Sequence, residues 1–71
     1  MNRKPRYIIV TDIEEYPACI NADFFLSAIR YKNNNGSMYT RLKWIGPGMD
    51  SPEELKVLDT PQQIYEKLKR A

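Results

Sequence analysis

The segment "RYKNNNGSMYTRLKW", residues 30–44, constrains the fold more than any other part of this chain. At its centre "NNNG" is a strong turn signal, because Asn tolerates a positive φ and Gly adopts one at no steric cost. Aromatic residues and threonine, which favour strands, flank the turn. The segment therefore predicts a β-hairpin.

Two loop lengths fit this turn. With a two-residue loop, Asn35 and Gly36, Arg30 lies opposite Arg41, whereas a four-residue loop, 33–36, pairs Arg30 with Tyr39. The longer loop is slightly favoured, since like charges directly opposite one another are unfavourable. Side chains alternate along a strand, so both loops predict the same two faces. One face is largely apolar and holds Ser27, Ile29, Tyr31, Thr40, Leu42 and Trp44; the other holds Arg30, Lys32, Tyr39, Arg41 and Lys43.

The N-terminal part of the chain predicts a second pair of strands. Residues 7–13, "YIIVTDI", have the β-branched and aromatic composition of a strand, and "ACIN" at 18–21 resumes the apolar pattern after an acidic turn. Residues 22–29 fit either one or two helical turns behind an Asn21 cap or a strand that begins near Phe24 or Phe25. The strand is preferred, because a β-rich segment and a clear turn follow.

The C-terminal part predicts a loop, a short strand and a helix. Residues 46–54 form an exposed loop, in which Ser51 as a cap predicts one helical turn, and residues 55–59 form a final strand. In "TPQQIYEKLKRA", Thr60 is a helix cap followed by Pro61, and Gln63 completes a capping box. The apolar side of this helix carries Ile64, Tyr65 and Leu68.

Together these elements predict an α+β fold: a small antiparallel sheet of four or five strands in meander order, with one C-terminal helix packed on one face. With 71 residues the chain is expected to form a single domain with a thin core, and residues 1–5 a flexible tail. The longest apolar runs, "YIIV" and "FFL", are far shorter than a membrane helix requires. A cytoplasmic protein without a membrane partner is therefore expected.

The residue types leave little room for catalysis. The chain has no histidine and one cysteine, so an internal disulfide and sites built from Cys and His ligands are excluded. Cys19 lies in an apolar run and is expected to be buried. Asp12, Glu14 and Glu15 are close together, but solvated turn acids are the simpler interpretation. We expect no enzyme activity, no cofactor, no metal site and no small-molecule substrate.

Charge is distributed unevenly along the chain. The net charge is only +2, but the 24–49 stretch contains four cations and no acid. A ribbon of alternating cations can contact phosphates, and a tyrosine can stack on a base. The candidate nucleic-acid contacts are Arg30, Lys32, Tyr39, Arg41 and Lys43; the simpler interpretation is a solvated sheet face whose charges prevent edge-to-edge pairing.

Trp44 is expected in the core, but an exposed Trp44 together with Tyr31 would form a partner surface.

Two segments resemble a known family. "ACINADFFLSAI" and "LKVLDTPQQIYEKL" are similar to the apolar-Ile-Asn segment and to the closing strand, cap and amphipathic helix of small FlbD-type proteins of flagellar and swarming motility. The resemblance covers about Ala18 to Leu68, and the chain departs from it in "IGPGMDSPEEL" and the basic hairpin. It implies a β-meander followed by a helix, without catalysis or cofactor.

The sequence thus favours a non-enzymatic interaction or oligomerisation module that binds a protein partner, or a second copy of itself, through a sheet edge or an apolar patch. A nucleic-acid-binding module that uses the basic hairpin, residues 30–44, is the alternative.

Overall fold

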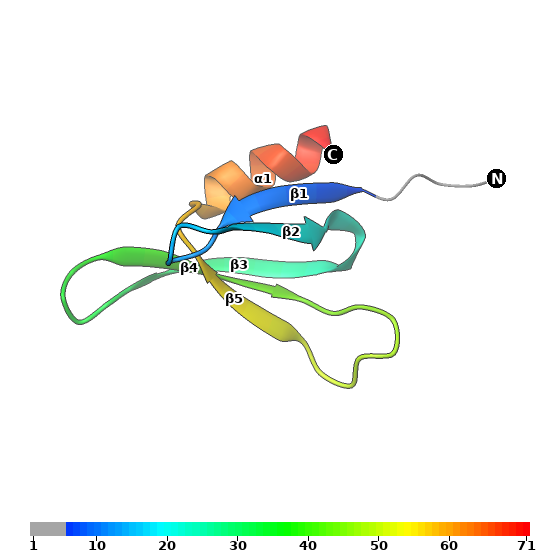
Figure 1. The fold of residues 1–71 in the computed structure, drawn as a ribbon, viewed down its shortest axis with the longest axis horizontal. Coiled ribbons are helices and arrows are strands. Elements are labelled where there is room, and N and C mark those ends of the chain that lie inside the picture. The colour runs from blue at the N-terminus through cyan, green and yellow to red at the C-terminus, as the bar shows by residue number, and fades with distance from the viewer. Residues whose placement is uncertain (1–5) are drawn as a thin grey trace.

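The computed structural model describes residues 6–71, which form five strands, a short 3-10 helix and one α-helix (Figure 1). The predicted flexible tail, residues 1–5, lies outside the described residues. The strands are β1 (Tyr7–Thr11), β2 (Pro17–Asn21), β3 (Phe25–Lys32), β4 (Met38–Trp44) and β5 (Glu53–Val57). The 3-10 helix η1 spans Ala22–Phe24, and helix α1 spans Pro61–Arg70. The α+β class and the C-terminal helix are confirmed.

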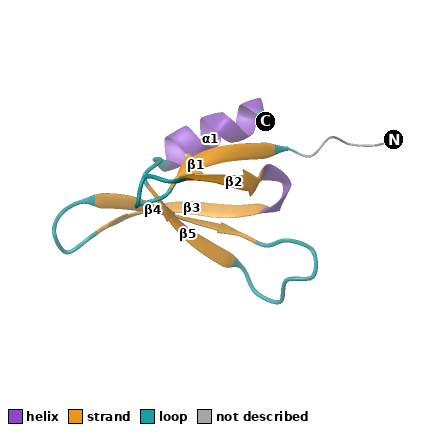
Figure 2. Ribbon diagram, in the orientation of Figure 1, coloured by secondary structure: helices purple, strands orange, loops and turns teal. Residues whose placement is uncertain are grey.

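The prediction of one sheet of four or five strands is wrong. Antiparallel pairing joins β1 to β2, and separately joins β3 to β4 and β4 to β5, so the chain forms a two-stranded and a three-stranded sheet (Figure 2). Helix η1 lies between β2 and β3, where the Asn21 side chain accepts a hydrogen bond from the Asp23 amide. This cap turns the chain at the end of β2, so β3 continues in the second sheet.

The two sheets meet where β1 ends and β5 ends. The Leu58 amide donates to the Thr11 carbonyl at 2.8 Å, and Asp12 forms an isolated bridge with Val57. The core lies between the sheets and under the helix, and its buried side chains come from β1, β2, β4, β5 and α1: Ile8, Val10, Ile20, Leu42, Val57 and Ile64.

The register of the β3–β4 hairpin differs from both predicted registers. Ala28 lies opposite Leu42, Arg30 opposite Thr40 and Tyr31 opposite Tyr39. The Asn33 amide donates to the Ser37 carbonyl, and the Gly36 amide donates to the Asn33 carbonyl with Gly36 at φ +92°. Three residues, 34–36, therefore form the loop between this closing pair, in the manner of a turn followed by a left-handed glycine. A loop with an odd number of residues shifts β3 by one residue against β4. Each face predicted from the sequence therefore combines β3 and β4 residues that lie on opposite faces of the sheet in the structure.

The segment after β4 is shorter than the predicted loop. Residues 53 and 54 of the predicted 46–54 loop belong to β5, where Glu53 pairs with Trp44 and Glu54 with Lys43. The helical turn predicted behind Ser51 is therefore wrong: a single turn is costly to nucleate, and the extended backbone gains a ladder of hydrogen bonds instead. The start of β3 at Phe25 agrees with the preferred interpretation of residues 22–29.

Helix α1 begins at the predicted cap. The Thr60 side chain accepts a hydrogen bond from the Gln63 amide at 3.1 Å, and the Gln63 side chain accepts one from the Thr60 amide at 2.8 Å. Ile64 is buried, Leu68 is partly buried against the core and Tyr65 is exposed, and all three line one groove beside β3, so they share a side of the helix as predicted. No helix within residues 6–71 is long and apolar enough to cross a membrane.

The capping box gives a direct test of how α1 is held. Replacing Thr60 with Ala removes the acceptor for the Gln63 amide, so we expect the free energy of unfolding to fall by about 1 kcal/mol in urea denaturation. Gln62→Ala is the matched control, because Gln62 is exposed in the same turn and makes only a 3.5 Å contact with Glu66. Equal stability of the two variants would contradict this role of the cap.

Candidate interaction surfaces

The four cations of the β3–β4 hairpin are divided between the two faces of the three-stranded sheet. Arg30 and Lys32 share a face with Thr40 and Leu42, which is the face toward the core. The Arg30 Nη1 donates to the Thr40 hydroxyl at 3.1 Å and to the Leu58 carbonyl at 3.4 Å. Arg30 therefore has a structural role, and it is not grouped with Tyr39, Arg41 and Lys43 as the sequence predicted.

The opposite face carries a stack of tyrosines and cations. The Tyr31 and Tyr39 rings stack with their centroids 5.8 Å apart at an interplanar angle of 20°. The Arg41 guanidinium lies 4.6 Å from the Tyr31 centroid, and the Lys56 ammonium lies 5.3 Å from the Tyr39 centroid. Lys43 lies on the same side of β4. We call this surface the tyrosine–cation face; it consists of Tyr31, Tyr39, Arg41, Lys43 and Lys56.

The electrostatics of this face are not fully balanced. Arg41 lies directly opposite Lys56 on β5, a like-charge pair, and the nearest acid, Glu54, has a carboxylate oxygen 3.9 Å from the Arg41 Nε. The Arg41 Nε is shielded from solvent and has no hydrogen-bond acceptor within residues 6–71. The Tyr39 side chain is the main cause that raises the pKa of the Arg41 guanidinium above its ordinary value, and Glu54 also raises it. Arg41 is therefore charged at neutral pH.

Lys56 was missed by the sequence analysis. Lys56 lies within the strand predicted over residues 55–59, but the sequence does not show that this strand pairs with β4, which places Lys56 opposite Arg41. The predicted partner surface of Tyr31 and Trp44 is not formed, because the two side chains lie on opposite faces. Trp44 packs against the core as predicted, and Tyr31 lies on the tyrosine–cation face.

A second surface lies on the outward side of the β1–β2 hairpin. Ile8 and Val10 point into the core, so Tyr7 and Ile9 point away from it and are 55% and 53% exposed. Cys19 lies opposite Ile9 and is exposed, so the prediction that it is buried is wrong. Cys19 is exposed because side chains alternate along β2, and Ala18 and Ile20 occupy the positions that face the core. We call this apolar surface, formed by Tyr7, Ile9, Pro17 and Cys19, the hairpin outer face.

The free edge of β1 is continuous with that surface. The Arg6 carbonyl accepts from the Ala22 amide, so even-numbered positions bond toward β2 and the backbone of Tyr7, Ile9 and Thr11 points to the other side. The Thr11 amide donates to Asp59, and the Ile9 carbonyl accepts from Lys67. The Tyr7 backbone and the Ile9 amide have no hydrogen-bond partner in the described part of the chain.

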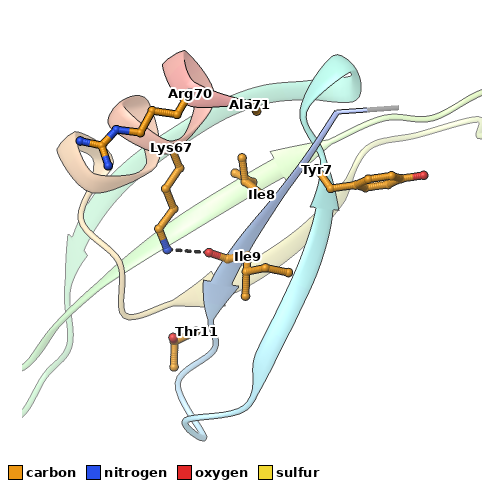
Figure 3. Close-up of a pocket in the computed structure, with 7 residues that line it drawn as sticks. All are labelled: Tyr7, Ile8, Ile9, Thr11, Lys67, Arg70 and Ala71. Carbon is orange, nitrogen blue, oxygen red and sulfur yellow. Dashed lines mark hydrogen bonds between the residues drawn. The ribbon is translucent and has the colours of Figure 1, made fainter. Parts of the chain in front are cut away.

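A shallow groove of about 430 Å³ follows this free edge. Its charged lining residues are Lys67 and Arg70 of α1, and Ala71 lies at its end. Figure 3 shows Lys67 reaching from the helix to the Ile9 carbonyl, while Tyr7 projects away from the helix. The groove therefore presents backbone donors and acceptors on one wall and cations on the other.

Asp59 joins this edge to the helix. Its carboxylate is 9% exposed and accepts from the Thr11 amide at 2.7 Å and from the Lys67 ammonium at 2.7 Å. Burial raises the pKa of Asp59, but the hydrogen bonds from Lys67 and Thr11 outweigh burial, so the pKa lies below its usual value. The ionised carboxylate is thus the form that the fold binds.

The acids of the β1–β2 turn have a structural explanation. The Asp12 carboxylate accepts from the Glu14 and Tyr16 amides, each at 2.9 Å, and Glu15 adopts φ +70°. Asp12 therefore forms the turn that its position in the sequence predicts. Within residues 6–71 no group of three or more His, Cys, Asp or Glu residues is placed to hold a metal ion.

Comparisons with known proteins give no match to a family model, to a curated protein or to a solved structure. The resemblance to FlbD-type proteins stays a prediction.

The pKa of Asp59 predicts how stability depends on pH. Because the folded-state pKa lies below the unfolded value, the carboxylate stabilises the fold above about pH 4, and this contribution is lost as the pH falls through the folded-state pKa. We expect Asp59→Asn to lower the free energy of unfolding at pH 7 by about 1–3 kcal/mol, and to flatten its decline in acid. Denaturant titrations from pH 7 to pH 2 measure both effects.

Asp50→Asn is the control, because Asp50 is exposed and its side chain makes no hydrogen bond within residues 6–71. A decline in acid that is as steep in Asp59→Asn as in the natural chain would contradict the assignment.

Proposed function

We propose that this protein is a non-enzymatic interaction module that binds an extended segment of a protein partner along the free edge of β1. The observation that carries the proposal is that the Tyr7 backbone and the Ile9 amide are unpaired within residues 6–71, while the apolar side chains of the same two residues are exposed. A peptide that adds to a sheet edge gains affinity from backbone hydrogen bonds and specificity from alternate side chains. Both components are present at this edge.

The length of the free edge sets the size of the bound segment. Thr11 already bonds to Asp59 and Leu58, so a new strand can pair only with the first half of β1. The groove of about 430 Å³ accommodates a few residues of extended chain. The hairpin outer face extends the contact, because Ile9 and Cys19 are opposite one another and both exposed.

The charge of the groove indicates what kind of segment fits. Of its charged lining residues, Lys67 is already paired with Asp59, whereas Arg70 has no acidic partner within residues 6–71, so an acidic side chain of the bound strand near Arg70 is favoured. A second copy of this chain would bring a second Arg70 to the same groove, and like charges at an interface are costly. We therefore propose a different protein with an acidic extended segment as the partner. Self-association through β1 is the competing outcome.

The proposal predicts which peptides this protein selects. From a library of random peptides, we expect enrichment of extended, acidic sequences that bind with micromolar affinity. Ile9→Asp should weaken their binding at least about 10-fold, because it removes the apolar contact and repels the acid. Ile29→Asp is the matched control, since Ile29 is 51% exposed in a strand, but on the other sheet. Absence of enrichment, or equal binding by the two variants, would contradict the proposal.

The backbone component can be tested separately. A chain assembled by ligation at Cys19 allows the Ile9 amide to be N-methylated, which removes one outward donor and blocks strand addition without changing a side chain. We expect this protein to fold, as followed by circular dichroism, and to lose binding of the selected peptides. Sedimentation of the natural chain over a range of concentrations identifies self-association, which would replace the proposed partner with a second copy.

A further inference from the structure

We propose that the tyrosine–cation face is a second binding site, independent of the β1 edge, and that its ligand is single-stranded nucleic acid. Tyr31 and Tyr39 lie on it with three cations from two neighbouring strands, Arg41, Lys43 and Lys56. It lies on the side of the three-stranded sheet opposite to the buried residues Leu42 and Val57, so the two proposed ligands do not compete.

The cations are arranged for a polyanion. Arg41 and Lys56 are direct cross-strand neighbours, and Lys43 is two residues along β4 from Arg41. Glu54 is the acid opposite Lys43, so three cations and one acid leave this face with a charge of +2. Like charges directly opposite one another destabilise a sheet. A phosphate between Arg41 and Lys56 converts that repulsion into two attractions.

The tyrosines favour a single strand over a duplex. Tyr31 is 36% exposed at the edge strand β3, whereas Tyr39 is 7% exposed beneath it. Tyr39 thus supports Tyr31, and Arg41 lies over the Tyr31 ring. Unpaired bases stack on aromatic rings and on guanidinium planes, whereas the bases of an intact duplex are stacked on one another and do not offer their faces to either group.

The register of the hairpin supplies a matched pair of variants. Lys32 and Lys43 are both exposed lysines of the same hairpin, but they lie on opposite faces of the sheet. Replacing either with Ala changes the net charge by the same amount. An effect of general positive charge is therefore the same for both variants, and an effect of the tyrosine–cation face is specific to Lys43.

The experiment is a titration of fluorescently labelled oligothymidine with the purified protein, followed by anisotropy at several salt concentrations. Three phosphate contacts predict a slope of log K against log salt of about −2, which is a loss of about 20-fold between 50 and 200 mM salt. Lys43→Ala should reduce the slope by about 0.7 and Lys32→Ala should leave it unchanged. Tyr31→Leu should weaken binding at least about five-fold, with the fold verified by circular dichroism.

Three results would overturn the inference: no binding at 50 mM salt, equal effects of the two lysine variants, or tighter binding of a duplex of the same length. Ile9→Asp should bind the oligonucleotide like the natural chain, which separates this site from the β1 edge. Failure of oligonucleotide binding together with intact peptide selection would reject this inference and leave the proposed function standing.

Discussion

The hydrogen bonds of Asp59 hold the two ends of this chain together. A two-stranded sheet is marginally stable in water by itself, so the β1–β2 hairpin depends on contacts with the rest of the molecule. Asp59 supplies them at the point where β5 ends and α1 begins, by accepting from the Thr11 amide and from Lys67, which also donates to the Ile9 carbonyl. The same bonds limit the free edge of β1 to Tyr7 and the Ile9 amide, so one interaction both fixes the hairpin and defines its exposed edge.

The loop of the β3–β4 hairpin decides which charges act together. A loop with an even number of residues would place all four of its cations on the face that carries Tyr39. The three-residue loop that ends in Gly36 turns Arg30 and Lys32 toward the core side and leaves Arg41 and Lys43 with the tyrosines. Arg30 then bonds to Thr40, which is fully buried, so this cation stabilises the sheet.

Local signals in the sequence predicted the local structure. The Thr60 cap, the Asn-rich turn and the strand-forming composition of residues 7–11 each depend on neighbouring residues, and the structure has each of them. The partition into two sheets, the outward position of Cys19 and the contact of Lys56 with Tyr39 depend on pairing between distant segments. Periodicity gives the two sides of a strand, but it does not say which side meets the core. A shift of the β3–β4 register by one residue therefore places two of the predicted nucleic-acid contacts, Arg30 and Lys32, on the opposite face of the sheet from the other three.

Exposed apolar side chains are expected in a chain of this size, since a ten-residue helix cannot cover five strands. Exposure alone therefore does not distinguish a binding surface from incomplete coverage. At the hairpin outer face, the exposed side chains of Tyr7 and Ile9 lie beside unpaired backbone groups, because the Tyr7 backbone and the Ile9 amide have no hydrogen-bond partner within residues 6–71. At Ile29, a similarly exposed side chain lies among cations, where an apolar partner would have to desolvate charge. The two surfaces thus differ in the ligand that each can bind at low cost: an extended peptide at the β1 edge, and a polyanion on the tyrosine–cation face.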